Sequence, residues 1–371
     1  MRLGLVTTSY PRWAGDAAGS FVAGHAAYLR STGAEVEVVA ADDATVDRAW
    51  DRDQQVTRVP AAPGLFYAGG APEALTQRGH GRAAAGFAAR LAAAVLPGRG
   101  RWDAVAAHWL APSALAALPT RGPLLAIAHG GDVHLLARLR SLRPTTRALV
   151  ARGARVACVS RALAAAITDA APTLPTVVQP MGVDDDATAA VIRARAARAP
   201  SADVTIAVLA RLVPIKGVDA AIAALAALPA RCRLVIAGDG PERGSLAAAA
   251  RAFGVADRVT FAGWLDGPAR DALLAQADVV CVPSIVEHGR SEGTPLVALE
   301  ALAAGVPLVA TATGGLVELG TLGAHLIPPG APRALAEAIS AAVAQPTSPV
   351  PTLTWRAVGA RLDAHWRRPT A

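Results

Sequence analysis

Two carboxylates and a helix-start signal lie close together between residues 283 and 315. Glu292 precedes Thr294 and Pro295, a threonine that can cap a helix and a proline that can take its first position. The early N–H groups of such a helix favour an anion. Glu300 follows inside an apolar run, where a carboxylate needs a hydrogen-bonding partner. We predict a nucleotide-sugar site, with phosphate at the helix start, a sugar hydroxyl on Glu292 and a ribose diol on Glu300.

A second charged stretch follows the strand predicted at Thr205–Ala210. It carries Arg211 and Lys216 and leads through Gly217 into a helical run. Lys216 is the only lysine of the chain, whose other fixed cations are arginines, and this favours a point-charge role at that position. The alternative is a solvated loop before a helix. A diphosphate site accounts better for the lysine. Arg211 can form two hydrogen bonds to phosphate oxygens, and Lys216 can stabilise the negative charge that develops on a leaving diphosphate.

Glycine-containing loops follow other predicted strands. The turn that begins at Gly238 allows close approach to a ligand, but it is equally an ordinary tight turn. The loop containing Gly15 and Gly19 follows the first strand, and a phosphate or sugar contact is as well supported there as a plain connection. His129 follows the run 124–128 and precedes two glycines, so it is a better site candidate than most single histidines. For His108–Trp109, a packed aromatic pair is the preferred interpretation.

No cofactor or metal site is expected. His129 and His134 lack a third ligand at suitable spacing, and the sequence contains no Walker A, Gly-x-Ser-x-Gly or Cys-x-x-Cys motif. The three cysteines are widely spaced and are predicted to be buried free thiols.

The composition describes a globular protein. The chain has 371 residues, of which 53% are hydrophobic and 18% charged, so two domains with ample cores are expected. No apolar run reaches the roughly 20 residues of a membrane span. The start of the sequence is predicted to be a strand rather than a leader. We therefore expect a cytoplasmic protein, either free or held peripherally at the inner membrane face.

The net charge of +7 permits several anionic partners and selects none of them. The segment Arg138–Arg155 concentrates arginines and is most simply a solvated helical face; the alternative is contact with an anionic membrane. We expect no nucleic-acid partner.

Apolar strand-like runs alternate with Ala/Leu-rich helical runs along the whole chain, a pattern typical of parallel sheets covered by helices. A Pro/Gly/Arg-rich excursion is predicted at 50–81 and a linker at 180–201. The expected domains are 1–185 and 186–351, with a final helix in 352–371 that packs back on the first domain. Ligands of such sheets bind at the carboxyl ends of the strands.

Together these motifs resemble the retaining glycosyltransferases of family 4, which have the GT-B architecture of two Rossmann-like domains facing across a cleft. The resemblance spans nearly the whole chain and is carried by the following segments: Gly19–Val22, His129–Asp132, Val159–Ala162, Met181–Asp184, Arg211–Gly217, Gly238–Pro241 and Glu292–Ala310. The resemblance implies transfer of a sugar from a UDP- or GDP-sugar to a hydroxyl acceptor that the sequence does not identify. It implies these site residues: Arg211 and Lys216 for diphosphate; Glu292 for sugar hydroxyls; Glu300 for ribose; Gly238, Gly293, Thr294 and Pro295 around the donor; His129, Gly15 and Gly19 facing the transferred sugar.

The sequence departs from the family pattern where Thr294 and Pro295 replace an aromatic residue and a glycine, and where Met181 replaces an asparagine. Because of these departures, the sequence does not identify the donor sugar. No carboxylate nucleophile is evident near His129, so departure and attack on the same face of the sugar, without a metal, is the expected mechanism. The alternatives are a nucleotide-sugar epimerase of the same architecture and a catalytically silent nucleotide-sugar-binding module.

Overall fold

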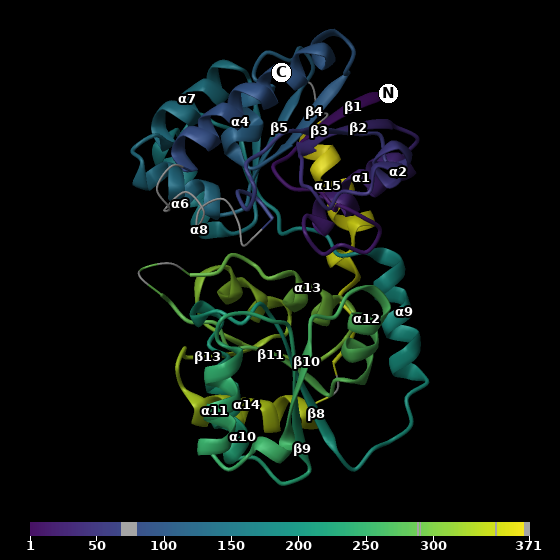
Figure 1. Ribbon diagram of the computed structural model, residues 1–371, viewed down its shortest axis with the longest axis vertical. Helices are drawn as coiled ribbons and strands as arrows, with labels where there is room; N and C mark the ends of the chain where they lie inside the picture. Colours follow the sequence, from purple (N-terminus) through teal and green to yellow (C-terminus); the bar gives the residue numbers. More distant parts are fainter. Residues whose placement is uncertain (68–79, 288, 290, 346, 367–371) are drawn as a thin grey trace. The chain divides into compact units, whose positions relative to one another are not determined.

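The chain forms two compact units in a computed structural model that describes residues 1–67, 80–287, 289, 291–345 and 347–366 (Figure 1). Unit 1 comprises Met1–Gly182 and the segment from Trp355, and unit 2 comprises Val183–Thr354. The two junctions each lie three residues from the expected boundaries at 185 and 351.

Unit 1 is built on a parallel seven-stranded sheet in the order β3-β2-β1-β4-β5-β6-β7. The central strands β4 and β5 are buried along their whole length, because Ala, Val, Leu and Ile occupy both of their faces. The strands are β1 (Arg2–Val6), β2 (Glu35–Ala41), β3 (Val56–Val59), β4 (Ala104–His108), β5 (Leu124–Ala128), β6 (Arg155–Cys158) and β7 (Thr176–Val178).

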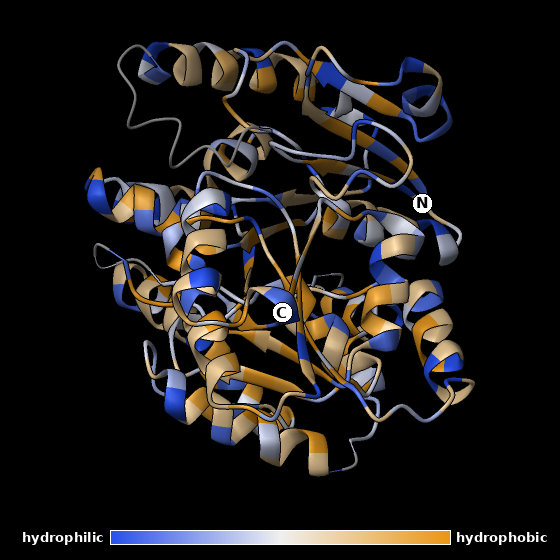
Figure 2. Ribbon diagram, turned by 60° about the horizontal axis from the view of Figure 1, so that its bottom comes forward, coloured by the Kyte–Doolittle hydropathy of each residue, from blue (hydrophilic) through white to orange (hydrophobic). Residues whose placement is uncertain are grey.

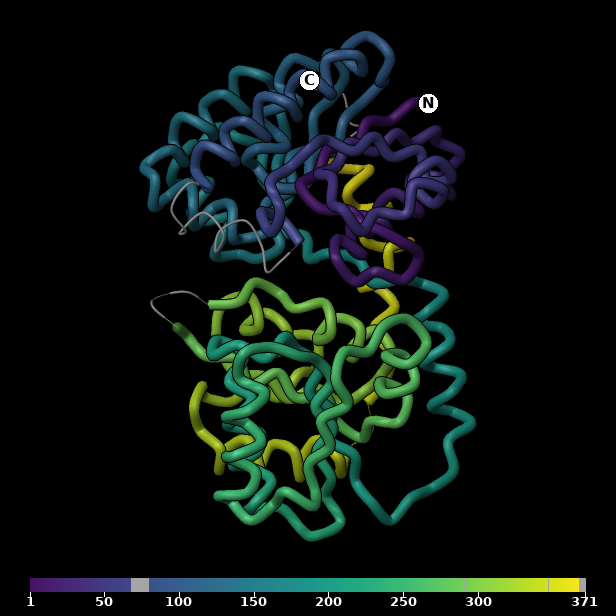
Figure 3. Tube along the Cα trace, viewed as in Figure 1, coloured from purple at the N-terminus to yellow at the C-terminus, as the bar shows by residue number. Residues whose placement is uncertain are grey.

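Helices cover this sheet. They are α1 (Ser20–Ser31), α2 (Arg48–Asp53), α4 (His80–Val95), α5 (Leu115–Ala117), α6 (Gly131–Arg138), α7 (Leu142–Ala151), α8 (Arg161–Ala170) and α15 (Trp355–Trp366), with short turns η1 (Leu96–Gly100) and η2 (Leu110–Ala114). The α15 helix returns from the end of the chain to pack beside α1, as the yellow tube among purple segments shows (Figure 3).

Unit 2 repeats the plan with a parallel six-stranded sheet in the order β10-β9-β8-β11-β12-β13. Its strands are β8 (Val204–Leu209), β9 (Cys232–Ala237), β10 (Val259–Gly263), β11 (Val279–Val282), β12 (Leu308–Thr311) and β13 (His325–Ile327). Its helices are α9 (Asp185–Ala196), α10 (Val218–Ala226), α11 (Arg243–Ala252), α12 (Gly267–Gln276), α13 (Leu296–Ala303) and α14 (Pro332–Ala344), with turns η3 (Pro214–Lys216), η4 (Ala256–Arg258), η5 (Gly314–Leu322) and η6 (Pro351–Leu353).

The core of unit 2 lies on both faces of its sheet. Along β8, Ile206 and Val208 join one buried cluster while Ala207 between them joins another, because successive residues of a strand point to opposite faces. Hydrophobic residues accordingly dominate the strands, whereas the helices carry both hydrophobic and hydrophilic residues (Figure 2). The prediction of two parallel-sheet, Rossmann-like units is confirmed.

Two local predictions were only partly right. The excursion predicted at 50–81 contains most of α2 and the edge strand β3, which pairs with β2 although it has only 4 residues. Residues 68–79 lie outside the described part of the chain. The linker predicted at 180–201 contains α9, which is capped by Asp184 and packs on α12 of unit 2. Val183 and Thr354 form a parallel bridge where the chain enters and leaves unit 2.

Candidate active site

Lys216 and Glu292 form an ion pair in unit 2. Lys216 ends the turn that follows β8, and Glu292 lies in the segment after β11; these neighbouring strands bring the two loops to one edge of the sheet. The backbone N–H of Ile285 donates to the carbonyl of Ile215 at 2.9 Å and joins the two loops. The side chains are 20% and 13% exposed, so each charge is partly desolvated and paired. Two residues predicted from separate motifs therefore meet.

Ser284 completes the environment of the Glu292 carboxylate. Its hydroxyl donates to the second carboxylate oxygen, Oε2, while Lys216 Nζ binds Oε1. Ser284 is itself buried, and its carbonyl accepts the Thr311 hydroxyl at the end of β12. Sequence reasoning missed Ser284. Its position just after a buried strand was the available signal, because side chains there lie at the carboxyl edge of the sheet.

Close packing of Gly314 fixes the backbone around Glu292. Gly314 has φ 50°, and a Cβ there would lie 2.0 Å from the Glu292 carbonyl, so only glycine fits. The N–H of Gly315 donates to the same carbonyl at 3.2 Å. The next two residues, Gly293 and Thr294, also lie against Gly315, because a Cβ added there would fall within 2.8 Å of both.

The start of α13 differs from its prediction. The helix begins at Leu296, and Pro295, with ψ 135°, is its N-cap rather than its first residue. Pro295 makes no side-chain hydrogen bond as the cap, and Thr294 does not take the N-cap position that was expected of it. The Thr294 hydroxyl oxygen lies near Gly315, because a Cβ built on that glycine would be 2.7 Å from it. Gly19 is the N-cap of α1, and α11 begins at Arg243.

Glu300, in the second turn of α13, pairs with Arg270 of α12. The two side chains are 21% and 25% exposed. The predicted need for a partner is thus met in part by a guanidinium, which sequence reasoning did not identify. Arg270 is one of many arginines, and only its contact with Glu300 in the folded chain distinguishes it.

Arg211 and Gly238 lie in adjoining loops after β8 and β9. The N–H of Leu212 donates to the carbonyl of Asp239 at 2.9 Å, and that of Glu242 donates to the carbonyl of Leu212 at 3.1 Å. The predicted cationic loop and the predicted glycine turn are therefore hydrogen-bonded to each other.

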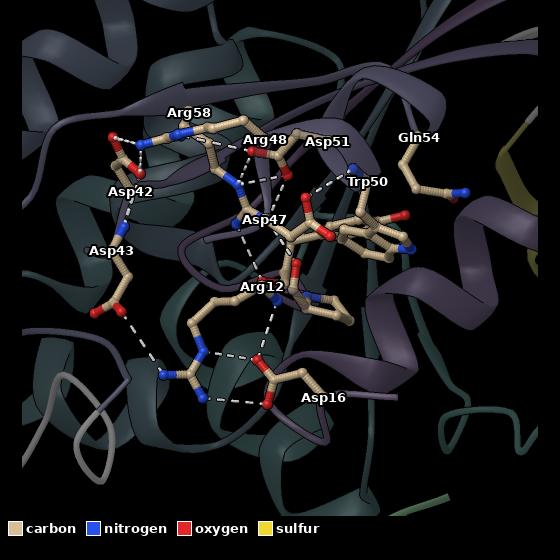
Figure 4. Close-up of polar contacts among 12 residues, drawn as sticks. Arg12, Asp16, Asp42, Asp43, Asp47, Arg48, Trp50, Asp51, Gln54 and Arg58 are labelled. Atoms are coloured by element: carbon tan, nitrogen blue, oxygen red, sulfur yellow. Dashed lines mark hydrogen bonds and ion pairs between the residues drawn. The ribbon is translucent and has the colours of Figure 1, made fainter. Parts of the chain in front are cut away.

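In unit 1, the loop that carries Gly15 and Gly19 is braced by a charged network (Figure 4). Arg12 Nε donates to Asp16 Oδ2 at 2.7 Å, and the Arg12 guanidinium lies 3.7 Å from Asp43. Burial alone raises the pKa of Asp16, but the hydrogen bonds from Arg12 reverse this and hold the pKa below its ordinary value. The loop is therefore tied across to the end of β2.

Arg58 of β3 also supports the start of the loop that carries Gly15 and Gly19. Its side chain is 3% exposed and binds the Asp51 carboxylate at 2.8 Å (Figure 4). It also donates to the carbonyls of Tyr10 and Pro11. A buried guanidinium needs such multiple acceptors. The edge strand that sequence reasoning missed thus positions the start of the glycine loop.

His129 lies at the end of a line of three histidines. Its Nε2 is 3.0 Å from His108 Nδ1, and His108 Nε2 is 3.0 Å from His25 Nδ1. His25 and His108 are fully buried, whereas His129 is half-buried between the rings of Phe21 and Trp109, with centroids at 4.9 and 4.8 Å. Because Phe21 lies in the first turn of α1, the loop ending at Gly19 and His129 come together.

The pKa values of two of these imidazoles, His108 and His129, are lowered. Burial, together with repulsion from His25 whenever that ring is protonated, lowers the pKa of His129 to about 3. Burial and the two neighbouring histidines lower the pKa of His108 well below its ordinary value. The interpretation of His108–Trp109 as a packed aromatic pair was incomplete, because His108 is the centre of this line.

Asp132 shapes the turn that presents His129. Its buried carboxylate accepts the N–H of Leu110 at 2.7 Å, of Gly130 at 3.0 Å and of His129 at 3.2 Å. Burial raises the pKa of Asp132, although these N–H bonds favour the charged form. Its oxygens are therefore engaged with the backbone and hold the loops after β4 and β5 together.

Within the described ranges, no cluster of three or more His, Cys, Asp or Glu side chains could hold a metal ion. Cys158, Cys232 and Cys281 are buried and free, which confirms that prediction. In the described part of the chain, no helix is both long and apolar enough to cross a bilayer.

Two doubly wound units with polar loops at the carboxyl ends of their strands define a GT-B fold. The chain belongs to the family 4 type of glycosyltransferase: residues 18–187 match the family model "Glycosyltransferase Family 4", and residues 193–351 match "Glycosyl transferases group 1". The family resemblance of the sequence is thereby confirmed.

Curated relatives match parts of the chain. A GDP-mannose-dependent alpha-(1-6)-phosphatidylinositol monomannoside mannosyltransferase of Mycobacterium tuberculosis is 41% identical over 31% of this chain and 31% of its own length. A D-inositol 3-phosphate glycosyltransferase of Salinispora tropica is 38% identical over 40% of this chain and 34% of its own length. The putative colanic acid biosynthesis glycosyltransferase WcaL of Escherichia coli is 30% identical over 60% and 55%. The matched region thus spans less than two thirds of each relative.

Solved structures share the fold over nearly the full chain. Sucrose-phosphate synthase from Thermosynechococcus elongatus has a TM-score of 0.71 at 19% identity and covers 99% of this chain and 98% of that one. HepE from Anabaena, solved in complex with UDP, has a TM-score of 0.65 at 21% identity, with 99% and 96% covered.

Proposed function

We propose that this protein transfers a sugar from a UDP- or GDP-sugar to a hydroxyl acceptor, with retention of configuration and without a metal. The observation that carries the proposal is the pairing of the sole lysine, Lys216, with Glu292 beside the start of α13. The family match and the donors named for its relatives, GDP-mannose for the mannosyltransferase and UDP-glucose for HepE, support a nucleotide-sugar donor.

The proposed reaction depends on stabilising the negative charge of the leaving diphosphate. As the bond from the anomeric carbon to phosphate breaks, negative charge grows on the leaving diphosphate. Lys216, Arg211 and the N–H groups at the start of α13 stabilise that charge, because each is fixed at the same edge of the unit 2 sheet. Glu292 holds sugar hydroxyls, and Glu300 holds the ribose. The diphosphate competes with Glu292 for the ammonium of Lys216.

Same-face departure and attack fits the surroundings of His129 better than double displacement. A double displacement requires a carboxylate free to attack the anomeric carbon. Asp132 is the acid that adjoins His129, and its oxygens accept backbone N–H groups in a buried turn. The leaving phosphate then takes the acceptor proton, and His129 with the loop of Gly15 and Gly19 contacts the transferred sugar.

The test is release of UDP and GDP from a panel of nucleotide sugars and hydroxyl acceptors, with the anomeric configuration of the product read by NMR. Acceptor-dependent release that survives an excess of EDTA is the expected result. A strict need for a divalent metal, or an inverted product, contradicts the mechanism. Interconversion of donor sugars without acceptor identifies an epimerase, and tight donor binding without turnover identifies a silent binding module.

The acceptor is proposed to be presented at an anionic membrane surface. Four exposed arginines, Arg138, Arg140, Arg143 and Arg147, lie on or between α6 and α7 beside Leu139, which is 62% exposed. This exposed arginine face is smaller than the segment Arg138–Arg155 that the sequence indicated. Arg152 instead donates to the carbonyls of Thr120 and Gly122, and Arg155 donates to that of His365.

A further inference from the structure

The hydrogen-bonded line of His25, His108 and His129 couples the tautomers of its three imidazole rings. Each internal contact joins Nδ1 of one ring to Nε2 of the next, at 3.0 Å in both cases. Each contact carries one proton, and a neutral imidazole has one N–H and one bare nitrogen. If His108 carries its proton on Nε2, it donates to His25 and must accept from His129 Nε2. If the proton is on Nδ1, both bonds reverse.

The three rings must therefore share one tautomer. In one state all three carry the proton on Nε2, and the outer nitrogen of His129, Nδ1, is an acceptor. In the other state all three carry it on Nδ1, and the same atom is a donor. No net charge changes between the two states, and the tautomer of the half-buried ring is set by two rings that water does not reach.

The far end of the line is held in place. The His25 ring stacks on Trp355 with the centroids 5.0 Å apart and the planes within 2°. Trp355 packs tightly against the backbone: a Cβ at Gly24 would lie 2.1 Å from its ring, and one at Gly182 would lie 2.6 Å away. The His25 ring is thereby clamped by the residue at which the chain re-enters unit 1.

The near end is held as well. Phe21 and Trp109 enclose the His129 ring, and the buried Asp132 carboxylate fixes its backbone N–H. Asp132 is an acidic group in contact with this segment, and it accepts hydrogen bonds from the backbone N–H groups. The ring therefore has one orientation, with Nε2 turned to His108 and Nδ1 left for a ligand.

We propose that His25 and His108 are positioning residues that fix the orientation and tautomer of His129, so that its Nδ1 meets a sugar hydroxyl in a defined donor or acceptor role. The part that concerns the sugar rests on the proposed function. The part that concerns the coupled tautomers does not.

The first experiment is NMR of the full chain with ¹⁵N-labelled histidine at pH 7. The chain has eight histidines, and single His-to-Gln variants assign their signals. We expect His25, His108 and His129 to be neutral and to show the same tautomer. A mixed set of tautomers, or a protonated ring among the three, overturns the inference. The readout needs no turnover, so it stands even if the protein proves not to be a transferase.

The second experiment compares His25→Asn with His25→Leu. Asparagine keeps a polar atom near the position of Nδ1 and leucine keeps only bulk, so the asparagine variant should retain the wild-type tautomer of His129 and the leucine variant should lose it.

With an active donor–acceptor pair, we expect His25→Leu and His108→Phe to lower kcat about 10- to 100-fold with little change in donor KM, as misplacement of a contact group does. His134→Gln, an exposed histidine outside the line, is the matched control. Equal behaviour of the two His25 variants contradicts the proposal.

Discussion

Lys216 and Glu292 satisfy each other's charge before any donor binds, and Ser284 supplies the remaining carboxylate contact. Removal of either partner therefore leaves the other partly buried and unpaired, as well as removing its own contact with substrate. At the scale of single residues, the candidate site is a set of prearranged pairs rather than of free charges.

Lys216→Met and Glu292→Gln should each lower kcat about 100- to 1000-fold, the range seen when one group that stabilises developing charge is removed. Circular dichroism and thermal melting should show both variants folded. Glu337→Gln, which breaks an exposed ion pair with Arg333 on α14, is the matched control and should remain fully active. Near-normal turnover in either site variant would remove its assigned role.

Glu300→Ala should weaken nucleotide binding about 10- to 100-fold, because a hydrogen bond to a charged group contributes about 1.5 to 3 kcal/mol. Calorimetry with UDP and GDP measures the loss, and their 2′- and 3′-deoxy analogues locate it. Wild type should discriminate against the deoxy analogues, whereas Glu300→Ala should not. If the variant keeps the full discrimination, Glu300 serves only as the partner of Arg270.

At the scale of elements, three separate pieces of unit 1 contribute one histidine each: α1, β4 and the turn after β5. Adjacent parallel strands β4 and β5 bring His108 and His129 together, and α1 packs over them with His25. The same burial that aligns these rings disfavours their charged forms, so folding stability must depend on pH.

The direction of that dependence follows from the lowered pKa values of His108 and His129. The unfolded chain binds protons on these histidines below pH about 6.5, while the folded chain does not. The free energy of unfolding is therefore highest above pH 6.5 and falls as the pH decreases toward the folded pKa of His129, about 3. Each histidine contributes a slope approaching about 1.4 kcal/mol per pH unit.

Urea unfolding between pH 4.5 and 7.5 measures this slope. In His129→Gln the slope between pH 4.5 and 6 should fall by about 1 kcal/mol per pH unit. The comparison with wild type also cancels the opposite contribution of Asp132, whose raised pKa makes folding less favourable as the pH rises from its ordinary value. An unchanged slope would mean that His129 is protonated in the folded state.

At the scale of the whole molecule, the net charge of +7 is an average over the entire surface, whereas a membrane responds to local clusters. The exposed arginines of α6 and α7 form such a cluster in unit 1. Each is expected to contribute about 1 kcal/mol to binding of an anionic surface at low salt.

Replacement of Arg138, Arg140, Arg143 and Arg147 by glutamine should abolish flotation with vesicles rich in phosphatidylserine and leave turnover of a soluble acceptor intact. The matched control carries the same charge change at exposed arginines of unit 2: Arg231, Arg233, Arg251 and Arg333. That variant should float like wild type. Equal loss in both variants would indicate a nonspecific charge effect, and equal retention would remove the membrane proposal.

The sequence by itself determined the class of fold, the family and the loops in which the candidate site lies. Alternating buried strands and helices require parallel sheets, and parallel sheets gather the loops after their strands at one edge. Lys216, Glu292 and His129 could be selected because each follows such a strand and is unusual in its surroundings.

The tertiary structure alone decided which side chains meet. Arg270 and Glu300, Ser284 and Glu292, and the three histidines are each far enough apart in sequence, or common enough in type, that no local pattern joins them. Their pairing depends on which helices pack on which strands, and on glycines such as Gly314 that let two loops touch. The edge strand β3 and the true start of α13 were hidden for the same reason, because tertiary contacts overrode short and weak local signals.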